Sequence, residues 1–247
     1  MQAASLYTGM AGLQAITAQM QAVSSNLSNA QTPGYQAVQA VTAAQFYQGG
    51  NAPPGADPAA ETLGPDAAPG PLKQTGDPMN LGIGGDAWLE VQTMSGPALT
   101  RNGSLSVSST GLLTDSAGNP VLNTDNTPIS LPQLAKLEIG SDGTVSGVEA
   151  SDTSGRARVF GRIALVSAPP ASLSALGGSL YQAAAGTPLT PAQNASLHQG
   201  YLNESNVDPT TAMMQMIDCS RSYQMQTELL KNQSSTSQDL NSLLAQG

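Results

Sequence analysis

The chain has 247 residues, enough to bury a core as one large or two ordinary domains. Its net charge of −9 argues against binding to nucleic acid or to anionic membranes, because both need clustered Lys and Arg. We expect no membrane-spanning helix, since no run of about 18 apolar residues occurs. The N-terminus lacks the basic start and apolar core of a cleaved signal peptide. Cys219 is the single cysteine, so an internal disulfide is excluded.

Residues 3–29 have the pattern of one long helix. Apolar side chains recur every seven residues, and others widen this line at three-four spacing. Such a repeat predicts a coiled-coil seam rather than a general amphipathic face. The residues assigned to this seam are Leu6, Met10, Leu13, Ile16, Met20, Val23 and Leu27.

The polar face of this helix is unusual because residues 1–56 contain no Asp, Glu, Lys, Arg or His. A helix that faces solvent normally carries charged side chains. One interpretation is a lone, weakly soluble helix. We favour a helix packed on all sides by neighbouring subunits, because uncharged polar groups can be buried at lower cost than charges.

Residues 49–71 are rich in Gly and Pro, which predicts a linker or long loop without regular elements. From about Leu81 to Tyr181 the sequence alternates short apolar runs with turn signals such as "RNGS" and "SDGT". This spacing favours an antiparallel β domain that is closed or barrel-like, so that its edges are hidden.

Two strands of this domain can be assigned faces from their alternation. In "DAWLEVQTM" we expect Ala87, Leu89 and Val91 on one face of the strand and Trp88, Glu90 and Gln92 on the other. In "RARVFGRIALV" we expect Arg156, Arg158, Phe160 and Arg162 on one face. The other face would then carry Ala157, Val159, Gly161, Ile163 and Leu165. These arginines either guard a solvated edge, which we favour, or meet an acidic neighbour.

The C-terminal region has the pattern of a second heptad helix. Asp208 is a candidate N-cap, and Pro209 suits the first helical position. Either helix alone has too few apolar neighbours for a large core, so we expect the two to pair and then to assemble further. The residues assigned to this second seam are Met213, Met216, Ile217, Tyr223, Leu230, Leu240 and Leu244.

We find no catalytic, cofactor or metal motif in this sequence. His198 has no carboxylate or Cys at a familiar catalytic spacing, and Cys219 has apolar neighbours that suit a small buried hydrophobe. "GIGGDA" is better explained as a tight turn than as a phosphate-binding loop. The residue types therefore predict a protein that is not an enzyme and needs no cofactor.

The stretch "SSNLSNAQTPGYQA" resembles the N-terminal signature of the bacterial flagellar rod and hook proteins. "LTRNGSLSV" is similar to a strand and turn of the family's β domain, and "HQGYLNESNVDP" to its C-terminal junction. These motifs occur in the family's order and, with others, cover most of the chain outside residues 49–71. The matching positions are Asn26, Leu27, Asn29, Thr32, Pro33, Gly34, Tyr35, Thr100, Arg101, Gly103, Asn206 and Val207.

The resemblance implies an α+β protein whose paired terminal helices form an inner coiled-coil tube. Within the family, proximal-rod proteins are the nearer likeness and distal-rod proteins the alternative. The implied partners are copies of the chain itself, adjacent rod subunits and the flagellar type III export apparatus, and the implied place is the rod across the periplasm. A secreted β-rich adhesin and a polysaccharide-degrading enzyme are the rival interpretations.

We expect the chain to divide into four parts. Residues 1–35 would hold the first rod-core helix, 36–80 a linker, 81–200 the β domain and 201–247 the second rod-core helix.

Overall fold

The computed structural model describes residues 2–47, 55–66, 68–152 and 154–244. The chain divides into two compact units. One, here called the helical unit, comprises Met1–Ser28, Val38–Leu63 and Asp208–Gly247; the other, the β unit, comprises Asn29–Ala37 and Gly64–Val207. The predicted α+β class with antiparallel pairing is confirmed. The four-part domain division stays a prediction.

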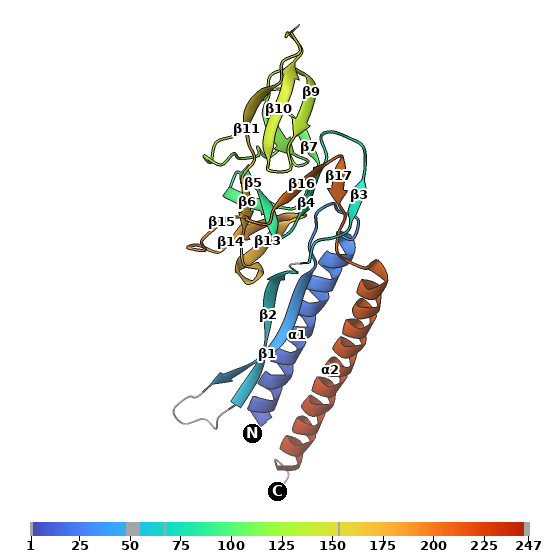
Figure 1. Cartoon of the computed structure of the whole chain (residues 1–247). Helices are drawn as coiled ribbons and strands as arrows, with labels where there is room; N and C mark the ends of the chain where they lie inside the picture. Colours follow the sequence, from blue (N-terminus) through green and yellow to red (C-terminus); the bar gives the residue numbers. More distant parts are fainter. Residues whose placement is uncertain (1, 48–54, 67, 153, 245–247) are drawn as a thin grey trace. The chain divides into compact units, whose positions relative to one another are not determined.

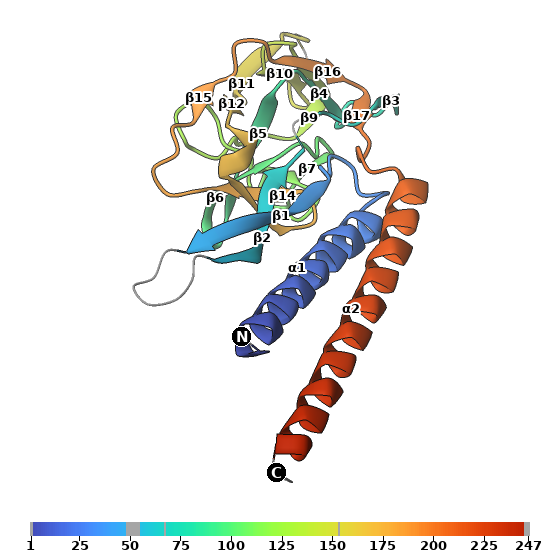
Figure 2. The same ribbon diagram turned by 90° about the horizontal axis from the view of Figure 1, so that it is seen from below.

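The helical unit contains both predicted helices. Helix α1 (Gln2–Ser28) packs along α2 (Pro209–Leu244), and the two run side by side and antiparallel (Figures 1 and 2). The predicted start of α2 is confirmed. Asp208 Oδ1 accepts a hydrogen bond from the Thr210 amide at 3.0 Å, and Oδ2 accepts one from Thr211 Oγ1 at 2.7 Å. These bonds favour the ionised carboxylate and lower the pKa of Asp208.

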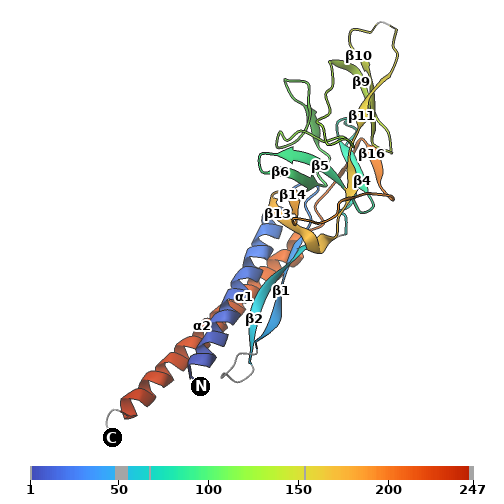
Figure 3. The ribbon, with the colours of Figure 1, turned by 90° about the vertical axis from the view of Figure 1, so that its left-hand side faces the viewer.

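A two-stranded sheet of β1 (Val38–Tyr47) and β2 (Gly55–Pro65) completes this unit beside α1 (Figure 3). The prediction that no regular element occurs in residues 49–71 is therefore wrong for β2. In a two-stranded sheet each strand has an open edge, where the missing N–H of proline removes no ladder bond. Residues 48–54 and 67 lie outside the described part.

The β unit holds the remaining strands. Its largest sheet has six strands in the order β13-β14-β6-β5-β12-β15, and a second sheet has the order β11-β10-β9. The strands are β3 (Leu72–Gln74), β4 (Leu81–Gly84), β5 (Ala87–Thr93), β6 (Gly96–Thr100), β7 (Leu105–Val107), β8 (Leu113–Asp115), β9 (Leu134–Ile139), β10 (Thr144–Glu149), β11 (Arg158–Arg162), β12 (Leu165–Ser167), β13 (Leu173–Gly177), β14 (Leu180–Ala183), β15 (Thr190–Pro191), β16 (Ser196–Gln199) and β17 (Tyr201–Asn203), with a 3₁₀ turn at Pro170–Ser172.

The expectation of a closed or barrel-like β domain is wrong. The six-stranded sheet is open, with β13 and β15 at its edges. Strand β15 has two residues, one of them Pro191, which cannot donate to a further strand. A short edge that ends in proline resists pairing without closure.

Strand β5 contributes to a cluster of buried apolar side chains on each of its two faces. Ala87, Leu89 and Val91 join the main cluster with residues such as Ile83 and Ile163. Trp88, on the other face, packs with Leu99, Ala168, Leu173 and Tyr181. The expected alternation is present, but Trp88 and Glu90 are only 2% and 7% exposed. Around Trp88, side chains from β6, β13 and β14 of the same sheet form a cluster on that face.

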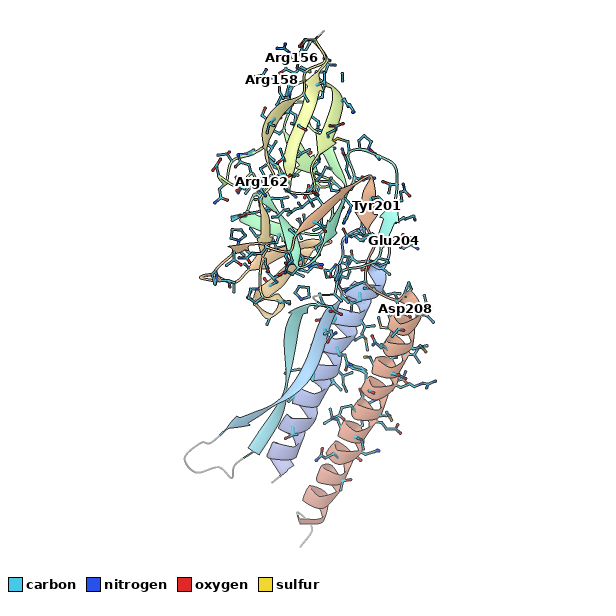
Figure 4. The ribbon with its side chains drawn as sticks, viewed as in Figure 1. Arg156, Arg158, Arg162, Tyr201, Glu204 and Asp208 are labelled. Atoms are coloured by element: carbon cyan, nitrogen blue, oxygen red, sulfur yellow. The ribbon has the colours of Figure 1, made fainter. Side chains whose placement is uncertain are left out.

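The arginine strand is shorter than predicted and contains a register shift. Strand β11 ends at Arg162, and its pairing with β10 slips near Phe160. Phe160 therefore packs against the main cluster while Val159 is 69% exposed, the reverse of the expected faces. Strand β11 is an edge strand, and Figure 4 places Arg156 and Arg158 near one end of it. Arg158 pairs with Glu149 at 2.8 Å within the chain.

Candidate functional site

The break after α1 is a compact turn, here called the signature loop (residues 29–37). The Thr32 amide donates to Asn29 O at 3.0 Å, and the Thr32 hydroxyl donates to Asn29 Oδ1 at 3.1 Å. The Tyr35 amide then donates to Thr32 O at 3.2 Å. The helix thus ends at Ser28, ahead of Thr32, and the Asn and Thr side chains supply the local bonds of the turn.

Gly34 is required by its backbone angle and by its surroundings. Its φ is +69°, in the left-handed region that favours glycine. A Cβ there would lie 2.3 Å from Arg101 C and from Asn102 N, which are backbone atoms that cannot rotate away. The Gly34 amide donates to Asn203 O at 2.9 Å. The signature glycine therefore lets the loop lie directly on the Thr100–Gly103 turn.

The end of the loop is held by a buried tyrosine from β14. Tyr181 Oη accepts from the Gln36 amide at 2.9 Å and donates to Gln36 O at 3.0 Å. Gln36 is fully buried and Tyr35 is 1% exposed. Burial is the main cause that raises the pKa of Tyr181. One phenol thus satisfies both backbone groups of Gln36, as a neighbouring strand would.

The Thr100–Gly103 turn is built for close packing. Thr100 Oγ1 donates to Ser179 O at 2.8 Å, and a Cβ on Gly103 would lie 1.8 Å from Leu81 O. Arg101 is 1% exposed, with its guanidinium 4.8 Å from the centre of the Trp88 ring. Its Nη2 donates to Gly85 O at 3.1 Å, and desolvation lowers its pKa.

Two asparagines of the C-terminal junction clasp other parts of the β unit. Asn203 accepts from the Ile83 amide at 2.7 Å and donates to Ile83 O at 3.1 Å, which fixes β17 to β4. Asn206 Oδ1 accepts from the Ala37 amide at 2.6 Å, and its Nδ2 donates to Ala68 O at 2.9 Å. Both side chains replace strand partners where the chain has no regular ladder.

Asn26 makes the same kind of clasp within the helical unit. Its Nδ2 donates to Val38 O at 2.9 Å, and its Oδ1 accepts from the Val38 amide at 2.8 Å. These bonds tie the last turn of α1 to the first residue of β1. The signature asparagine therefore fixes where the chain returns from the loop.

Sequence reasoning missed Gln36, Tyr181 and Asn203 as members of this arrangement. Tyr181 is remote from the loop in sequence, so no short motif could link them. Asn203 is the last residue of β17, where a buried asparagine must find hydrogen-bond partners, but its burial depends on the fold.

The helix pair contains a close contact between small and long residues. Gln226 Nε2 on α2 donates to Gly9 O on α1 at 3.2 Å. A Cβ on Gly9 would lie 2.5 Å from Leu230 Cδ2, so the glycine leaves room for that leucine. Ala15 and Val23 on α1, with residues such as Cys219 on α2, are buried. Burial is the main cause that raises the pKa of the Cys219 thiol.

The predicted seam residues have mixed exposure in the single chain, and their role in assembly stays a prediction. Val23 is buried, whereas Met10, Met213 and Ile217 are 52–55% exposed. The side chains of Leu6, Leu240 and Leu244 lie outside the described part. The half-buried members are Leu13, Ile16, Met20, Leu27, Met216 and Leu230.

Helix α2 has an apolar surface that the described part of the chain leaves exposed, here called the open α2 face. It is formed by large side chains that are more than half exposed, namely Met213, Met214, Ile217, Met225 and Leu229. Five such residues on one helix form a larger apolar surface than scattered single residues would. Such a surface is typical of a helix that binds other protein.

Polar side chains that could in principle take part in chemistry bond to nearby groups of the fold. His198 is exposed on β16, with Nε2 3.3 Å from Ser196 Oγ. Asp115 Oδ1 accepts hydrogen bonds from the amides of Ala117 and Asn119, which is typical of an aspartate in a turn. Over the described residues, neither helix carries an apolar stretch long enough to cross a bilayer.

Comparison with known proteins gives a consistent family. Residues 6–36 match a model of the flagella basal body rod protein, residues 82–147 the D1 domain of the flagellar hook protein FlgE/F/G, and residues 198–243 the C-terminal model of the flagellar basal body rod FlgEFG proteins. The first and last matches include the signature loop up to Gln36 and most of α2.

Full-length relatives show the same similarity. The flagellar basal-body rod protein FlgF of Escherichia coli is 32% identical over 97% of this chain and 98% of its own length. FlgF of Salmonella typhimurium is 31% identical with the same coverage, and the rod protein FlgG of Bacillus subtilis is 28% identical over 96% of this chain and 97% of its own. The signature loop, the Thr100–Gly103 turn, the asparagine clasps and this similarity over the whole chain together show that the protein belongs to the flagellar basal-body rod family.

Proposed function

We propose that this protein is a structural subunit of the flagellar basal-body rod, in its proximal part, where copies assemble helically into a shaft that transmits torque. The observation that carries the proposal is the helix pair, in which a charge-free α1 lies beside a helix with an open apolar face. FlgF relatives match nearly the full chain, which favours the proximal rod, while the FlgG match keeps the distal rod as the alternative.

A tube of coiled helices would cover the open α2 face. A contact between two different surfaces of identical subunits gives a helical filament when the rotation does not close. Met213 and Ile217 of one subunit would then lie against uncharged polar and apolar side chains of the next. Because α1 has no charged side chain, α1 itself would bring no unpaired ion into this packing.

The partners that we propose are copies of the chain, adjacent rod subunits and the type III export apparatus. The role is structural rather than catalytic, and it requires no small-molecule substrate, nucleic acid or cofactor. The support for this role is that the signature positions Gly34, Arg101 and Asn206 all bond or pack within the fold.

Deletion of the gene followed by electron microscopy of isolated basal bodies tests the proposal. We expect basal bodies that lack a complete rod, with recovery when the wild-type gene is returned. In a strain without distal-rod subunits, this protein should remain in the shortened rod if it is proximal. Complete basal bodies in the deletion strain would overturn the proposal.

The variant Leu13→Asp tests the helix seam. A charge placed in packed helices costs several kcal/mol, about 3–5 when it is unpaired, so we expect an exported, soluble protein that does not enter the rod. Ser95→Asp, on the exposed turn between β5 and β6, is the matched control, and cells that carry it should swim normally. If cells that carry Leu13→Asp swim normally, Leu13 is not part of the packed seam.

A further inference from the structure

Glu90 on β5 is a buried carboxyl group that the fold does not use. It is 7% exposed, on the face of β5 that also carries Trp88. Its backbone amide and carbonyl bond to Ala164 and Leu122, but within the described residues its carboxylate accepts no hydrogen bond and has no cation within salt-bridge distance. Desolvation alone raises its pKa. Among the described residues, the fully enclosed side-chain atoms that lack a hydrogen-bond partner belong to Arg101, so the Glu90 oxygens keep some access to water through the pocket that they line.

Glu90 lines a cavity of about 240 Å³ at the β12–β15 edge of the six-stranded sheet. One liquid water occupies about 30 Å³, so the space admits a group larger than a single water. Leu165 and Val166 from β12, with Leu189 and Pro191, form apolar walls. Thr124 and Asn126, from an exposed turn, add polar groups to the lining.

We propose that this cavity binds a primary alkylammonium group, the chemistry of a lysine side chain. An ammonium group carries three N–H donors and a positive charge. It could therefore donate hydrogen bonds to the Glu90 carboxylate and balance its negative charge. The apolar walls suit the methylene stem behind that charge. Among the described lining residues Glu90 is the one charged side chain, so a cation would meet no opposing positive charge there.

The binding test uses the purified full-length protein with glutamate labelled at the carboxyl carbon. The probe is n-butylammonium chloride at pH about 8, where carboxyl groups ionise. We expect a saturable shift of the Glu90 resonance with half-saturation on the order of 1–10 mM, as for one ion pair with a few apolar contacts. The uncharged n-butanol should give no saturable shift.

Two variants assign the effect to this cavity. Glu90→Gln should abolish the binding, whereas Glu138→Gln, an exposed residue that pairs with Lys136, should leave it unchanged. Near-ultraviolet circular dichroism of Trp88, the single tryptophan, checks that each variant is folded. No saturable shift in the wild-type protein would overturn the proposal, whatever the variants do, and so would equal binding by Glu90→Gln.

The source of the ammonium group is distinguished by a second probe, the blocked peptide acetyl-Gly-Lys-Gly-amide. Binding of both probes supports a lysine side chain of another protein as the natural occupant. Binding of n-butylammonium alone supports a small free amine. These measurements use the isolated chain, so their failure would leave the rod assembly test unaffected.

Discussion

Single residues in this protein replace the hydrogen bonds that regular strands would provide. Three side chains each bond both the backbone N–H and the backbone C=O of one other residue. The pairs are Tyr181 with Gln36, Asn203 with Ile83, and Asn26 with Val38. Such side chains hold irregular backbone in place at a few points. Loss of any one leaves two backbone groups without partners at once.

Gly34 gives the first residue-scale prediction. Gly34→Ala should lower the free energy of unfolding by about 2–5 kcal/mol, because it combines a positive φ with a backbone clash. Gly76→Ala is the matched control, since its φ is +75° but a Cβ there meets nothing within 4 Å. It should cost only about 1–2 kcal/mol. Urea unfolding of both variants is the measurement, and equal losses would show that the close approach to Arg101 does not matter.

Tyr181 gives a prediction with a pH dependence. Tyr181→Phe should cost about 1–3 kcal/mol, because it leaves the amide and carbonyl of Gln36 unpaired. The folded state raises the pKa of Tyr181 above the unfolded value of about 10, so its contribution is complete below that pH and falls as pH rises above it. The variant should therefore lose stability less steeply in alkali. Chemical unfolding between neutral and alkaline pH checks this, and parallel curves would contradict it.

At the scale of elements, periodicity and local chemistry were good guides for the helices. The heptads predicted both, and Asp208 followed by Pro209 located the start of α2 because capping depends on adjacent residues. The strands were harder. Coverage of Trp88 and pairing of β2 depend on strands distant in sequence, and the slip near Phe160 depends on the partner strand β10.

The same limit applied to the site. Gly34 and Arg101 could be picked out by their motifs, but their contact with each other depends on the fold. Tyr181 had no local signal, because a phenol in a strand is compatible with any exposed or buried position.

The cap of α2 gives an element-scale prediction. Asp208→Ala should reduce the helicity and thermal midpoint of the helical unit, because the Thr210 amide loses its acceptor. Asp218→Ala, which removes the same charge further along α2, is the control and should change little. In the wild type the lowered pKa of Asp208 means that this contribution is lost as pH falls through the acid range. Circular dichroism should show no difference between the variants if the cap is unimportant.

At the scale of the whole molecule, the two units differ in how their apolar residues are covered. Both clusters of buried apolar residues found among the described residues lie in the β unit. The helical unit instead exposes residues such as Met213 and Leu229. We expect other subunits to cover that face, so that the helical unit would reach its full stability only in the assembled rod.

This contrast predicts unequal local stability in the monomer. In dilute solution, amides of α1 and α2 should exchange with deuterium faster than those of β5 and β6, because fewer buried contacts oppose opening of the helices. Hydrogen exchange followed by mass spectrometry on a proven monomer is the measurement. Equally slow exchange in α1 and β5 would mean that the helix pair is stable without neighbours.

The charge-free α1 has a consequence for the ionic conditions that the helix pair tolerates. Dissolved salt weakens attraction between charged side chains beyond a screening distance of about 8 Å at physiological strength. No side chain of α1 can take part in an ion pair, and its contact with α2 includes a hydrogen bond from the uncharged amide of Gln226. Dilution or concentration of the surrounding electrolyte should therefore leave this contact nearly unchanged, so that a structure built from it would keep its stiffness as a bacterium moves between fresh and salty water.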